Sequence, residues 1–359
     1  MHTQGTLTTP KTFSLASLNS ELAKQKSATS PLKALPGMEI TPEFKSALNA
    51  IKNGSPLTFI TGKAGTGKTT LIHYLRTAIE KNLVVVAPTG IAALNVGGQT
   101  IHSFFQFPPR PVDLDEIKPV RNRILYEKLD VLIIDEVSMV RVDMIDAIDK
   151  FLRVNRDRPD TPFGGVQLVL VGDLFQLPPV IALEEEARMI ADRFASPFFF
   201  SAQSLQQLPL ASIELSRVFR QEEKDFIRLL SDIREGENLE HSVFEFNNKC
   251  INNEQSDKST ITLTCTNRRA NQINARKLIE IPSPVVEFTG RTKGRFNLKG
   301  DKLPAPYELI LKTGAQVMFT KNDSKHRWVN GTLGTVREFL NGYIMVEIEY
   351  NGRKNLYPV

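Results

Sequence analysis

The chain has 359 residues, of which 41% are hydrophobic and 24% charged, a length suited to about two or three domains that each bury a core. No apolar run is long enough to cross a bilayer and the N-terminus lacks a signal-peptide pattern, which excludes membrane-spanning classes and favours a cytoplasmic protein. The formal net charge is +5, and residues 1–37 (+3) and 287–359 (+5) leave −3 for the stretch between them. Charge by itself therefore does not indicate a nucleic-acid ligand.

The first segments of the chain differ in composition from the rest. Residues 1–37 are rich in Thr, Ser, Lys and Pro with little apolar periodicity, which predicts a disordered tail. Thr41-Pro42 predicts a helix start, with Thr41 as the N-cap and Pro42 at the first helical position. Cys250 and Cys265 match neither a metal site nor a disulfide framework, so a reducing compartment is the simple interpretation.

A glycine-rich segment, Gly62–Thr69, follows the apolar run Leu57–Ile60 and precedes a helix-forming stretch, Thr70–Ile79. It fits G-x-x-x-x-G-K-[ST], a pattern whose backbone N–H groups and helix N-terminus bind phosphates. Lys68 is expected to contact the β- and γ-phosphates, and the Thr69 hydroxyl to bind Mg²⁺. A turn that only joins strand to helix is the alternative, which the flanking pattern disfavours. The predicted ATP site consists of Gly62, Gly65, Thr66, Gly67, Lys68, Thr69 and Thr70.

Short apolar runs alternate with helical patterns beyond this segment. The runs lack the alternation of half-exposed strands, which indicates parallel strands buried on both faces. The pattern predicts the α/β class, with ligands at the carboxyl ends of the strands. The expected strands are Leu83–Ala87, Val131–Ile134, Leu168–Val171 and Ile261–Thr264, and expected helices include Val142–Leu152 and Asp225–Arg234.

Two carboxylates, Asp135 and Glu136, end the strand Val131–Ile134. In a P-loop protein this spacing places Asp135 to bind Mg²⁺ and Glu136 to orient and deprotonate an attacking water. An exposed acidic strand end is the alternative, but the preceding P-loop favours the catalytic role. A glutamate at the second position favours hydrolysis over transfer to a hydroxyl, so the pattern predicts an ATPase rather than a kinase.

Gln176 follows the strand Leu168–Val171. An amide at a third strand end can bond both the γ-phosphate and the attacking water, so it can report the nucleotide state. Pro178 and Pro179 stiffen the loop that follows. Taken alone, the segment fits a capped strand with a proline turn equally well.

A further polar set follows the second expected strand. Thr89, Gly90 and Ser103 are small residues that let a polyanionic backbone approach, and His102 and Phe104 offer stacking faces for unpaired bases. A pair of adjacent phenylalanines is more often part of a core, so both interpretations stay open.

Arg220 precedes the expected helix Asp225–Arg234. At the lip of a second α/β domain, it can reach the γ-phosphate held by the first domain and act as an arginine finger. Taken alone, an arginine here more commonly forms a surface ion pair.

The composition changes after about Pro282, where Gly, Lys and alternating β-branched or aromatic residues dominate. Expected strands are Gln316–Thr320 and Tyr343–Ile348, and Asn330-Gly331 and Asn341-Gly342 are typical hairpin-turn dipeptides. This part predicts a small antiparallel module, interpreted as a β-barrel.

Together these segments resemble the Pif/RecD-like branch of superfamily-one DNA helicases, closest to the bacterial Pif-type enzymes. The resemblance extends from about Thr41 to the C-terminus and rests on motifs in a fixed order. They are Gly62–Thr69 (motif I), Ala87–Ala93 (motif Ia), Thr100–Phe104 (a DNA-contact motif), Ile134–Met139 (motif II), Gly172–Val180 (motif III), Arg217–Gln221 (motif IV), and Leu311–Met318 with Val329–Thr332 (the β-barrel insertion).

The resemblance implies a fold of two RecA-like domains that clamp ATP and Mg²⁺ and move 5′ to 3′ along single-stranded DNA, with forked duplex as a further substrate. The implied DNA contacts are Thr89, Gly90, His102, Ser103, Phe104, Pro178 and Asn330, and the protein is expected to be a monomer in DNA repair, recombination or genome maintenance. The implied parts are the tail (1–37), a RecA-like ATPase domain (38–212) with a wedge insertion near 105–123, a partial second RecA-like domain (213–286) and the β-barrel module (287–359).

The chain departs from the family pattern twice. Glu43–Ala47 contains no glutamine of the kind that precedes motif I and reads adenine, so strict ATP preference is not implied. The late motifs are absent after Val359, which predicts a truncated chain with an incomplete second RecA-like domain. Such a chain is expected to bind nucleotide and DNA weakly and to unwind little or nothing by itself.

Two alternatives to a helicase remain. One is a nucleotide-gated single-stranded DNA-binding module that does not unwind. The other is an unrelated P-loop ATPase that drives a protein partner, which Gln176 and the segment of His102 and Phe104 disfavour.

Overall fold

The computed structural model describes residues 39–108, 111–181, 183–206, 208–220, 223–249, 260–290, 306–321, 323, 325, 327–340, 342–350 and 352–359. The chain divides into two compact units, with the boundary between Phe246 and Asn247. This boundary falls inside the segment 213–286 that the sequence predicts as a partial second RecA-like domain, and the predicted domain limits stay predictions. The predicted tail and Cys250 lie outside the described residues, and Cys265 is an exposed free thiol.

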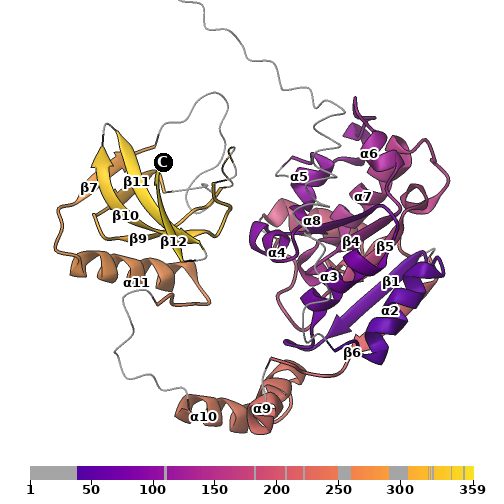
Figure 1. Cartoon of the computed structure of the whole chain (residues 1–359), viewed down its shortest axis with the longest axis horizontal. Coiled ribbons are helices and arrows are strands. Elements are labelled where there is room, and N and C mark those ends of the chain that lie inside the picture. Colours follow the sequence, from indigo (N-terminus) through magenta and orange to yellow (C-terminus); the bar gives the residue numbers. More distant parts are fainter. Residues whose placement is uncertain are drawn as a thin grey trace, which may run out of the picture. The chain divides into compact units, whose positions relative to one another are not determined.

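The first unit is built on a six-stranded sheet in the order β3-β2-β4-β5-β1-β6, with every strand pair parallel (Figure 1). Its central strands consist largely of Val, Leu and Ile, nearly all of them buried, as is typical of parallel strands that are covered on both faces. The predicted α/β class is confirmed. The strands are β1 (Leu57–Gly62), β2 (Leu83–Ala87), β3 (Gln99–Thr100), β4 (Val131–Ile134), β5 (Gln167–Val171) and β6 (Leu210–Leu215).

Helices connect these strands, and the N-terminal one begins where the sequence predicts. The Thr41 hydroxyl accepts the backbone N–H of Phe44 at 3.4 Å, and Pro42 is the first helical residue. The α-helices are α2 (Pro42–Lys52), α3 (Lys68–Ala78), α4 (Gly90–Asn95), α5 (Ile101–Phe105), α6 (Ile124–Glu127), α7 (Val142–Asn155), α8 (Glu184–Arg193), α9 (Lys224–Glu235) and α10 (Leu239–Lys249), and the 3₁₀ turns are η1 (Leu114–Glu116), η2 (Val137–Met139), η3 (Pro162–Gly165) and η4 (Phe199–Ser201). Within the described residues no helix combines the length and apolar character needed to cross a membrane.

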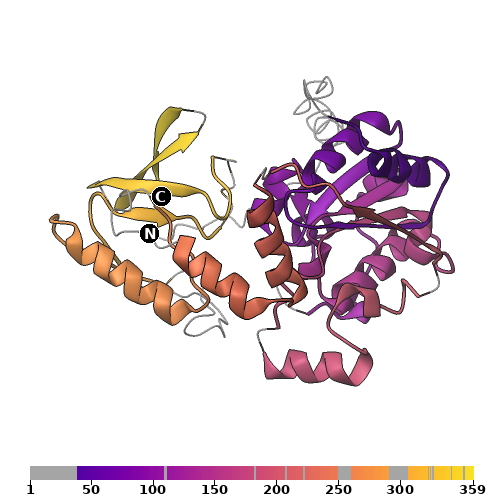
Figure 2. The same ribbon diagram turned by 90° about the horizontal axis from the view of Figure 1, so that it is seen from below.

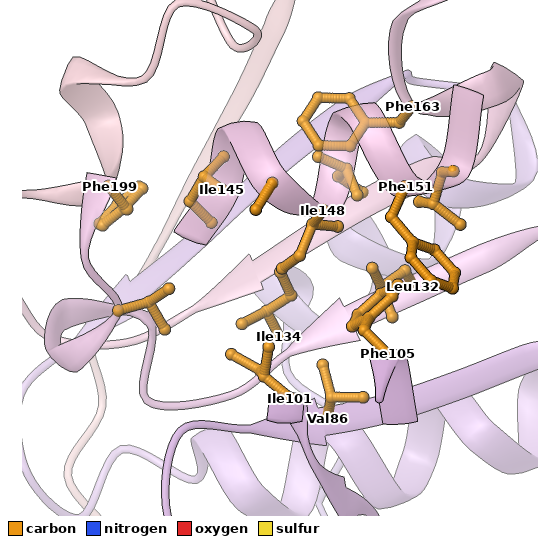
Figure 3. Close-up of a cluster of buried hydrophobic side chains, with 14 of the residues drawn as sticks. Val86, Ile101, Phe105, Leu132, Ile134, Ile145, Ile148, Phe151, Phe163 and Phe199 are labelled. Carbon is orange, nitrogen blue, oxygen red and sulfur yellow. The ribbon is translucent and has the colours of Figure 1, made fainter. Parts of the chain in front are cut away.

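The two faces of the sheet carry separate hydrophobic cores. Along β4, Leu132 and Ile134 belong to one core, and Val131 and Ile133 belong to the other, because successive side chains of a strand point to opposite faces. Figure 3 shows the first core, where side chains of α7 such as Ile148 lie against those of β4. Helices α2 and α3 contribute to the second core. The sheet is therefore held rigidly from both sides, and its edge is a stable platform for loops.

Residues 105–123, predicted as a wedge insertion, are irregular in their described part apart from Phe105, which ends α5, and the turn η1. Val112 packs against the first core, and the backbone N–H of Val120 donates to Oδ1 of Asn155 at 2.8 Å. The segment is anchored to the first unit, and its role as a wedge stays a prediction.

The second unit contains helix α11 and two antiparallel ladders, a four-stranded sheet in the order β12-β11-β10-β9 and the pair β7-β8. Figure 2 shows α11, in orange, beside the yellow strands. Leu311, Ala315 and Val336 form a small core to which α11 contributes Leu278. The elements are α11 (Asn267–Glu280), β7 (Val286–Thr289), β8 (Glu308–Leu311), β9 (Gln316–Met318), β10 (Leu333–Leu340), β11 (Tyr343–Tyr350) and β12 (Arg353–Pro358).

Two local predictions in this unit are wrong. Ile261–Thr264 is not a strand; Leu263 is 92% exposed, and an apolar run forms a strand only where a neighbouring strand pairs with it. Asn330-Gly331 does not join two strands directly, because Met318 pairs with Leu333 across a long connection. The dipeptide instead forms a tight turn at the end of that connection, with Thr332 N–H donating to Val329 O at 3.0 Å. The second predicted hairpin is confirmed, since Leu340 pairs with Tyr343.

Candidate active site

The predicted functional residues of the first unit gather at one edge of its sheet. The P-loop follows β1, Asp135 follows β4, Asp173 follows β5 and Thr89 follows β2. Because these strands are parallel, all four carboxyl ends lie at the same edge. Residues far apart in the sequence thereby form one site.

The P-loop leads from β1 into α3, which begins at Lys68, two residues before the predicted start. Gly67 caps the helix with φ +88°, in the left-handed region that favours glycine. The Lys68 ammonium donates to the carbonyl oxygens of Gly62 at 2.7 Å and of Lys63 at 3.2 Å. The hydroxyl of the buried Thr66 also donates to Lys63 O, at 2.8 Å. The loop thus wraps around the lysine, as a phosphate cradle requires.

A glycine is required at Gly62 because the chain is crowded there. A Cβ at this position would lie 2.7 Å from Leu215 O and 2.7 Å from Thr66 Oγ1. Strand β6, which ends at Leu215, therefore presses directly against the start of the P-loop.

Asp135 and Glu136 differ in burial and in backbone conformation. Asp135 is 5% exposed, and its burial, together with the nearby Glu136 charge, raises the pKa of Asp135 to about 6. Glu136 is partly buried and has φ 49°, a strained backbone for a residue with a Cβ, of a kind that clusters at functional sites. The pKa of Lys68 is lowered by burial, although the charges of Asp173, Glu136 and Asp135 oppose that shift. All these groups therefore act on one another electrostatically.

The residues predicted to bind Mg²⁺ fit a hard cation. Asp135 supplies a buried carboxylate, and the exposed Thr69 supplies a hydroxyl at the start of α3. Mg²⁺ prefers oxygen ligands and is often held by one or two protein groups plus substrate phosphates.

Gln176 lies in an exposed loop after β5. Its side-chain amide is held by Asp173 at the start of the same loop. Its Nε2 donates to Oδ2 of Asp173 at 3.2 Å, and its backbone N–H donates to Asp173 O at 3.0 Å. Gly172 allows the end of β5 to approach motif II, because a Cβ there would lie 3.1 Å from the Val137 backbone nitrogen. The start of the Gln176 loop thus lies against Val137, the residue that follows Glu136.

Two functional candidates were missed by the sequence analysis. Asp173, 1% exposed, accepts hydrogen bonds from Arg234 of α9 at 3.0 to 3.3 Å. Arg234 ends a predicted helix, and nothing in local spacing links it to a segment 61 residues earlier. The only available sequence signal was that Asp173 belongs to the motif III segment Gly172–Val180; its burial, which calls for a cationic partner, is visible only in the structure.

Arg220 is exposed in the connection between β6 and α9. The backbone N–H of the preceding Phe219 donates to Gly65 O of the P-loop at 2.8 Å. This bond places the Arg220 segment beside the nucleotide loop, as an arginine that serves this site requires. Its role as an arginine finger stays a prediction.

Predicted DNA contacts of motif Ia and its neighbour lie at the ends of two short helices. Thr89 caps α4, with its hydroxyl accepting the Ala92 N–H at 3.2 Å, and Gly90 is the first helical residue. Ser103 is exposed on α5. His102 is partly buried, and its pKa is lowered by burial and by the charge of Arg141.

The prediction that Phe104 stacks on bases is wrong for this structure. Phe104 is 4% exposed and its ring packs edge-on against Phe105 at 4.8 Å and Tyr126 at 5.4 Å. The Tyr126 hydroxyl also donates to Phe104 O at 2.7 Å. The helical turn of α5 directs this ring into the first core, where its apolar surface is removed from water.

Pro178 lies in an exposed loop whose apolar side chains face solvent. Phe175, Leu177 and Val180 are 61%, 67% and 71% exposed. Neighbouring apolar side chains left in water mark a surface that binds a partner. Asn330 is exposed in the second unit, and its role in DNA binding stays a prediction.

Comparison with known proteins gives a consistent result. Residues 39–243 match the family model described as PIF1-like helicase. The chain is 33% identical over 325 residues to the ATP-dependent DNA helicase PIF1 of Danio rerio, in an alignment that covers 87% of this chain and 49% of that protein. The chain spans about half the length of several curated relatives that it matches.

Solved structures are similar over most of the chain. The Pif1 helicase from Bacteroides in complex with ADP-AlF3 and single-stranded DNA superposes with a TM-score of 0.76 at 35% identity, covering 89% of this chain and 75% of that one. A structure that concerns DNA unwinding at forked double-stranded DNA by two coordinating Pif1 helicases gives a TM-score of 0.77 at 35% identity, covering 89% and 76%.

Proposed function

The chain belongs to the PIF1-like helicase family, as its motifs predict, and on that basis we propose that it is an ATP-dependent DNA helicase. It couples ATP hydrolysis to movement along single-stranded DNA. The observation that carries the proposal is the meeting of a P-loop lysine, a carboxylate pair and an amide at one sheet edge. Such a set can bind a triphosphate, activate a water and sense the γ-phosphate.

Each residue has a distinct part in the proposed hydrolysis. Lys68, which contacts P-loop carbonyls in this structure, turns its ammonium to the β- and γ-phosphate oxygens. Glu136 takes a proton from the attacking water, and Gln176 orients that water beside the γ-phosphate. Arg220 stabilises the charge that develops on the transferred phosphoryl group.

Mg²⁺ fits the same site. Asp135 and Thr69 would hold it, and when bound it would neutralise phosphate charge and orient the triphosphate. With the cation bound, Asp135 works as a carboxylate.

The DNA strand is proposed to run over the helix ends and loops at the same edge. Small residues at Thr89, Gly90 and Ser103 admit a phosphate backbone, and the exposed loop around Pro178 offers apolar contact to bases. The Pif1 structure with ADP-AlF3 and single-stranded DNA supports this class of ligand, and the structure with forked DNA supports a forked substrate. We further propose 5′-to-3′ movement, a monomer as the active unit, a cytoplasmic location and a role in genome maintenance.

The test is ATP hydrolysis with and without single-stranded DNA at fixed salt, because phosphate contacts make DNA affinity strongly salt-dependent. DNA is expected to stimulate hydrolysis, and Glu136→Gln is expected to lower the stimulated rate about 10²- to 10⁴-fold, as loss of a general base does. Glu184→Gln, on an exposed helix surface, is the matched control. Duplexes with a single 5′ or 3′ tail then report the direction of unwinding.

Other outcomes select another function. DNA binding without turnover would indicate a nucleotide-gated DNA-binding module. Hydrolysis that is indifferent to DNA would indicate a P-loop ATPase that drives a different partner.

A further inference from the structure

Arg234, near the end of α9, forms an ion pair with Asp173, which follows β5. Its guanidinium contacts the Asp173 carboxylate through Nη2–Oδ1 at 3.0 Å and Nε–Oδ2 at 3.2 Å, a two-pronged arrangement. The side chains of Arg234 and Asp173 are 16% and 1% exposed. The pair is therefore shielded from water and from salt, unlike a surface ion pair.

Asp173, held in place by Arg234, in turn orients the side-chain amide of Gln176. A carboxylate only accepts hydrogen bonds, so the end of the Gln176 amide that faces Oδ2 at 3.2 Å must be its NH₂ group. The carbonyl oxygen of that amide then points away from Asp173 and is the end available to accept a hydrogen from a water. The orientation of this amide is thus decided by the charge state and position of Asp173.

The charged state of Asp173 depends on Arg234. Burial raises the pKa of Asp173, but hydrogen bonds from Arg234, from the Phe175 backbone and from Gln176 outweigh it and leave the pKa below its usual value. The guanidinium also lies over the Phe175 ring, 4.2 Å from its centroid. Arg234 thus stabilises the negative charge of Asp173 and also packs against Phe175 in the Gln176 loop.

Helix α9 contacts the P-loop at the same time. Lys63 donates to Ser231 Oγ at 3.1 Å and pairs with Glu235 at 2.8 Å. The same helix follows the segment that carries Arg220. A single helix therefore contacts the nucleotide loop and the γ-phosphate-sensing loop together, and its docking can govern both.

We propose that Arg234 is a positioning residue for ATP hydrolysis, which acts through Asp173 to fix the orientation of Gln176. Hydrolysis then requires α9 to be docked against motif III. This inference rests on the proposed function, because it assigns a determinant of that same reaction.

The test compares kcat and KM of DNA-stimulated ATP hydrolysis by the whole chain and its variants. Arg234→Gln is expected to lower kcat about 10- to 100-fold with KM for ATP within about twofold, because a misoriented water costs rate rather than ground-state binding. Arg234→Lys is expected to recover part of the loss, since it keeps the charge but not the two-pronged geometry. Arg228→Gln, at an exposed position of the same helix, is the matched control and keeps the rate of the unaltered chain.

A double-mutant cycle shows whether Arg234 acts through Gln176. If it does, Arg234→Gln combined with Gln176→Ala has the same kcat as Gln176→Ala alone. Multiplying effects, or a rise in KM at unchanged kcat, would overturn the inference. Should Arg234→Gln not fold, as judged by thermal melting, Arg234→Lys carries the same cycle with a smaller single effect.

The outcome for the unaltered chain separates the two proposals. If it hydrolyses ATP on DNA while Arg234→Gln matches Arg228→Gln, only the positioning role is overturned. If it does not hydrolyse ATP at all, the proposed function fails and this inference fails with it.

Discussion

The two units of the chain use their sheets differently. In the first unit, every residue of β4 and nearly every residue of β2 and β5 is buried, and the strands run parallel. In the second unit, β10 and β11 mix buried and exposed residues and run antiparallel. A parallel sheet brings all its carboxyl ends to one edge, whereas an antiparallel sheet alternates them between two edges. This difference explains why the phosphate-binding, carboxylate and amide groups all belong to the first unit.

The largest expected effect is at the edge of the parallel sheet. Lys68→Met removes the ammonium that the P-loop surrounds, so ATP turnover should fall about 10²- to 10³-fold, as when one transition-state donor is lost. Steady-state hydrolysis measures this, with the exposed Lys45→Met on α2 as the control. Equal turnover in the two variants would show that the chemistry does not lie at this edge.

Within the first core, Phe105→Ala is expected to lower the free energy of unfolding by about 3–5 kcal/mol. Phe105 is 1% exposed and its ring contacts Phe107 and Phe151 at 5.4 and 5.3 Å between centroids. Figure 3 shows it beneath α7. Urea denaturation followed by circular dichroism measures the change. Phe105→Leu, which keeps most of the volume, should cost clearly less, and equal costs would argue against tight packing.

In the smaller core of the second unit, Val336→Ala should cost less, about 1.5 kcal/mol for two lost methyl-sized groups. Val336 is fully buried but has few buried neighbours, chiefly Leu311 and Ala315. Its effect should appear in the unfolding of the second unit and leave ATP turnover unchanged. Tyr350→Ala, at a 69% exposed position, is the control. A loss of ATP turnover in Val336→Ala would show that hydrolysis also depends on the core of the second unit.

The smallest expected effect is on the pH dependence of stability, through His102 at the edge of the parallel sheet. Burial and the Arg141 charge lower the pKa of His102 from 6.5, so below pH 6.5 the unfolded chain binds a proton more readily than the folded chain. Stability should therefore fall as pH drops through this range and be fully regained above pH 6.5. Unfolding midpoints at pH 5 to 8 should show a shallower slope for His102→Gln than for the unaltered chain, with the exposed His241→Gln for comparison. Identical slopes in all three would show that His102 does not contribute.

Local patterns predicted the site as far as each residue depends on its own strand. Lys68, Asp135, Glu136 and Gln176 each follow a short apolar run, and parallel pairing then places them at one edge without further information. The same reasoning failed for Ile261–Thr264, which pairs with no strand among the residues that the structure describes, because a strand is stabilised by partners that its own sequence does not contain.

The sequence by itself determined the P-loop turn, the strand that ends in two carboxylates, the class of fold and the family. Those features follow from short-range spacing, which sets strand ends, glycine turns and helix starts. Only the tertiary structure decided that Phe104 is buried, that Asn330 lies in a long connection and that Arg234 holds Asp173 beside Gln176. Each of these depends on which surfaces meet when distant segments pack, and packing is governed by the shape and burial of the whole unit rather than by neighbours along the chain.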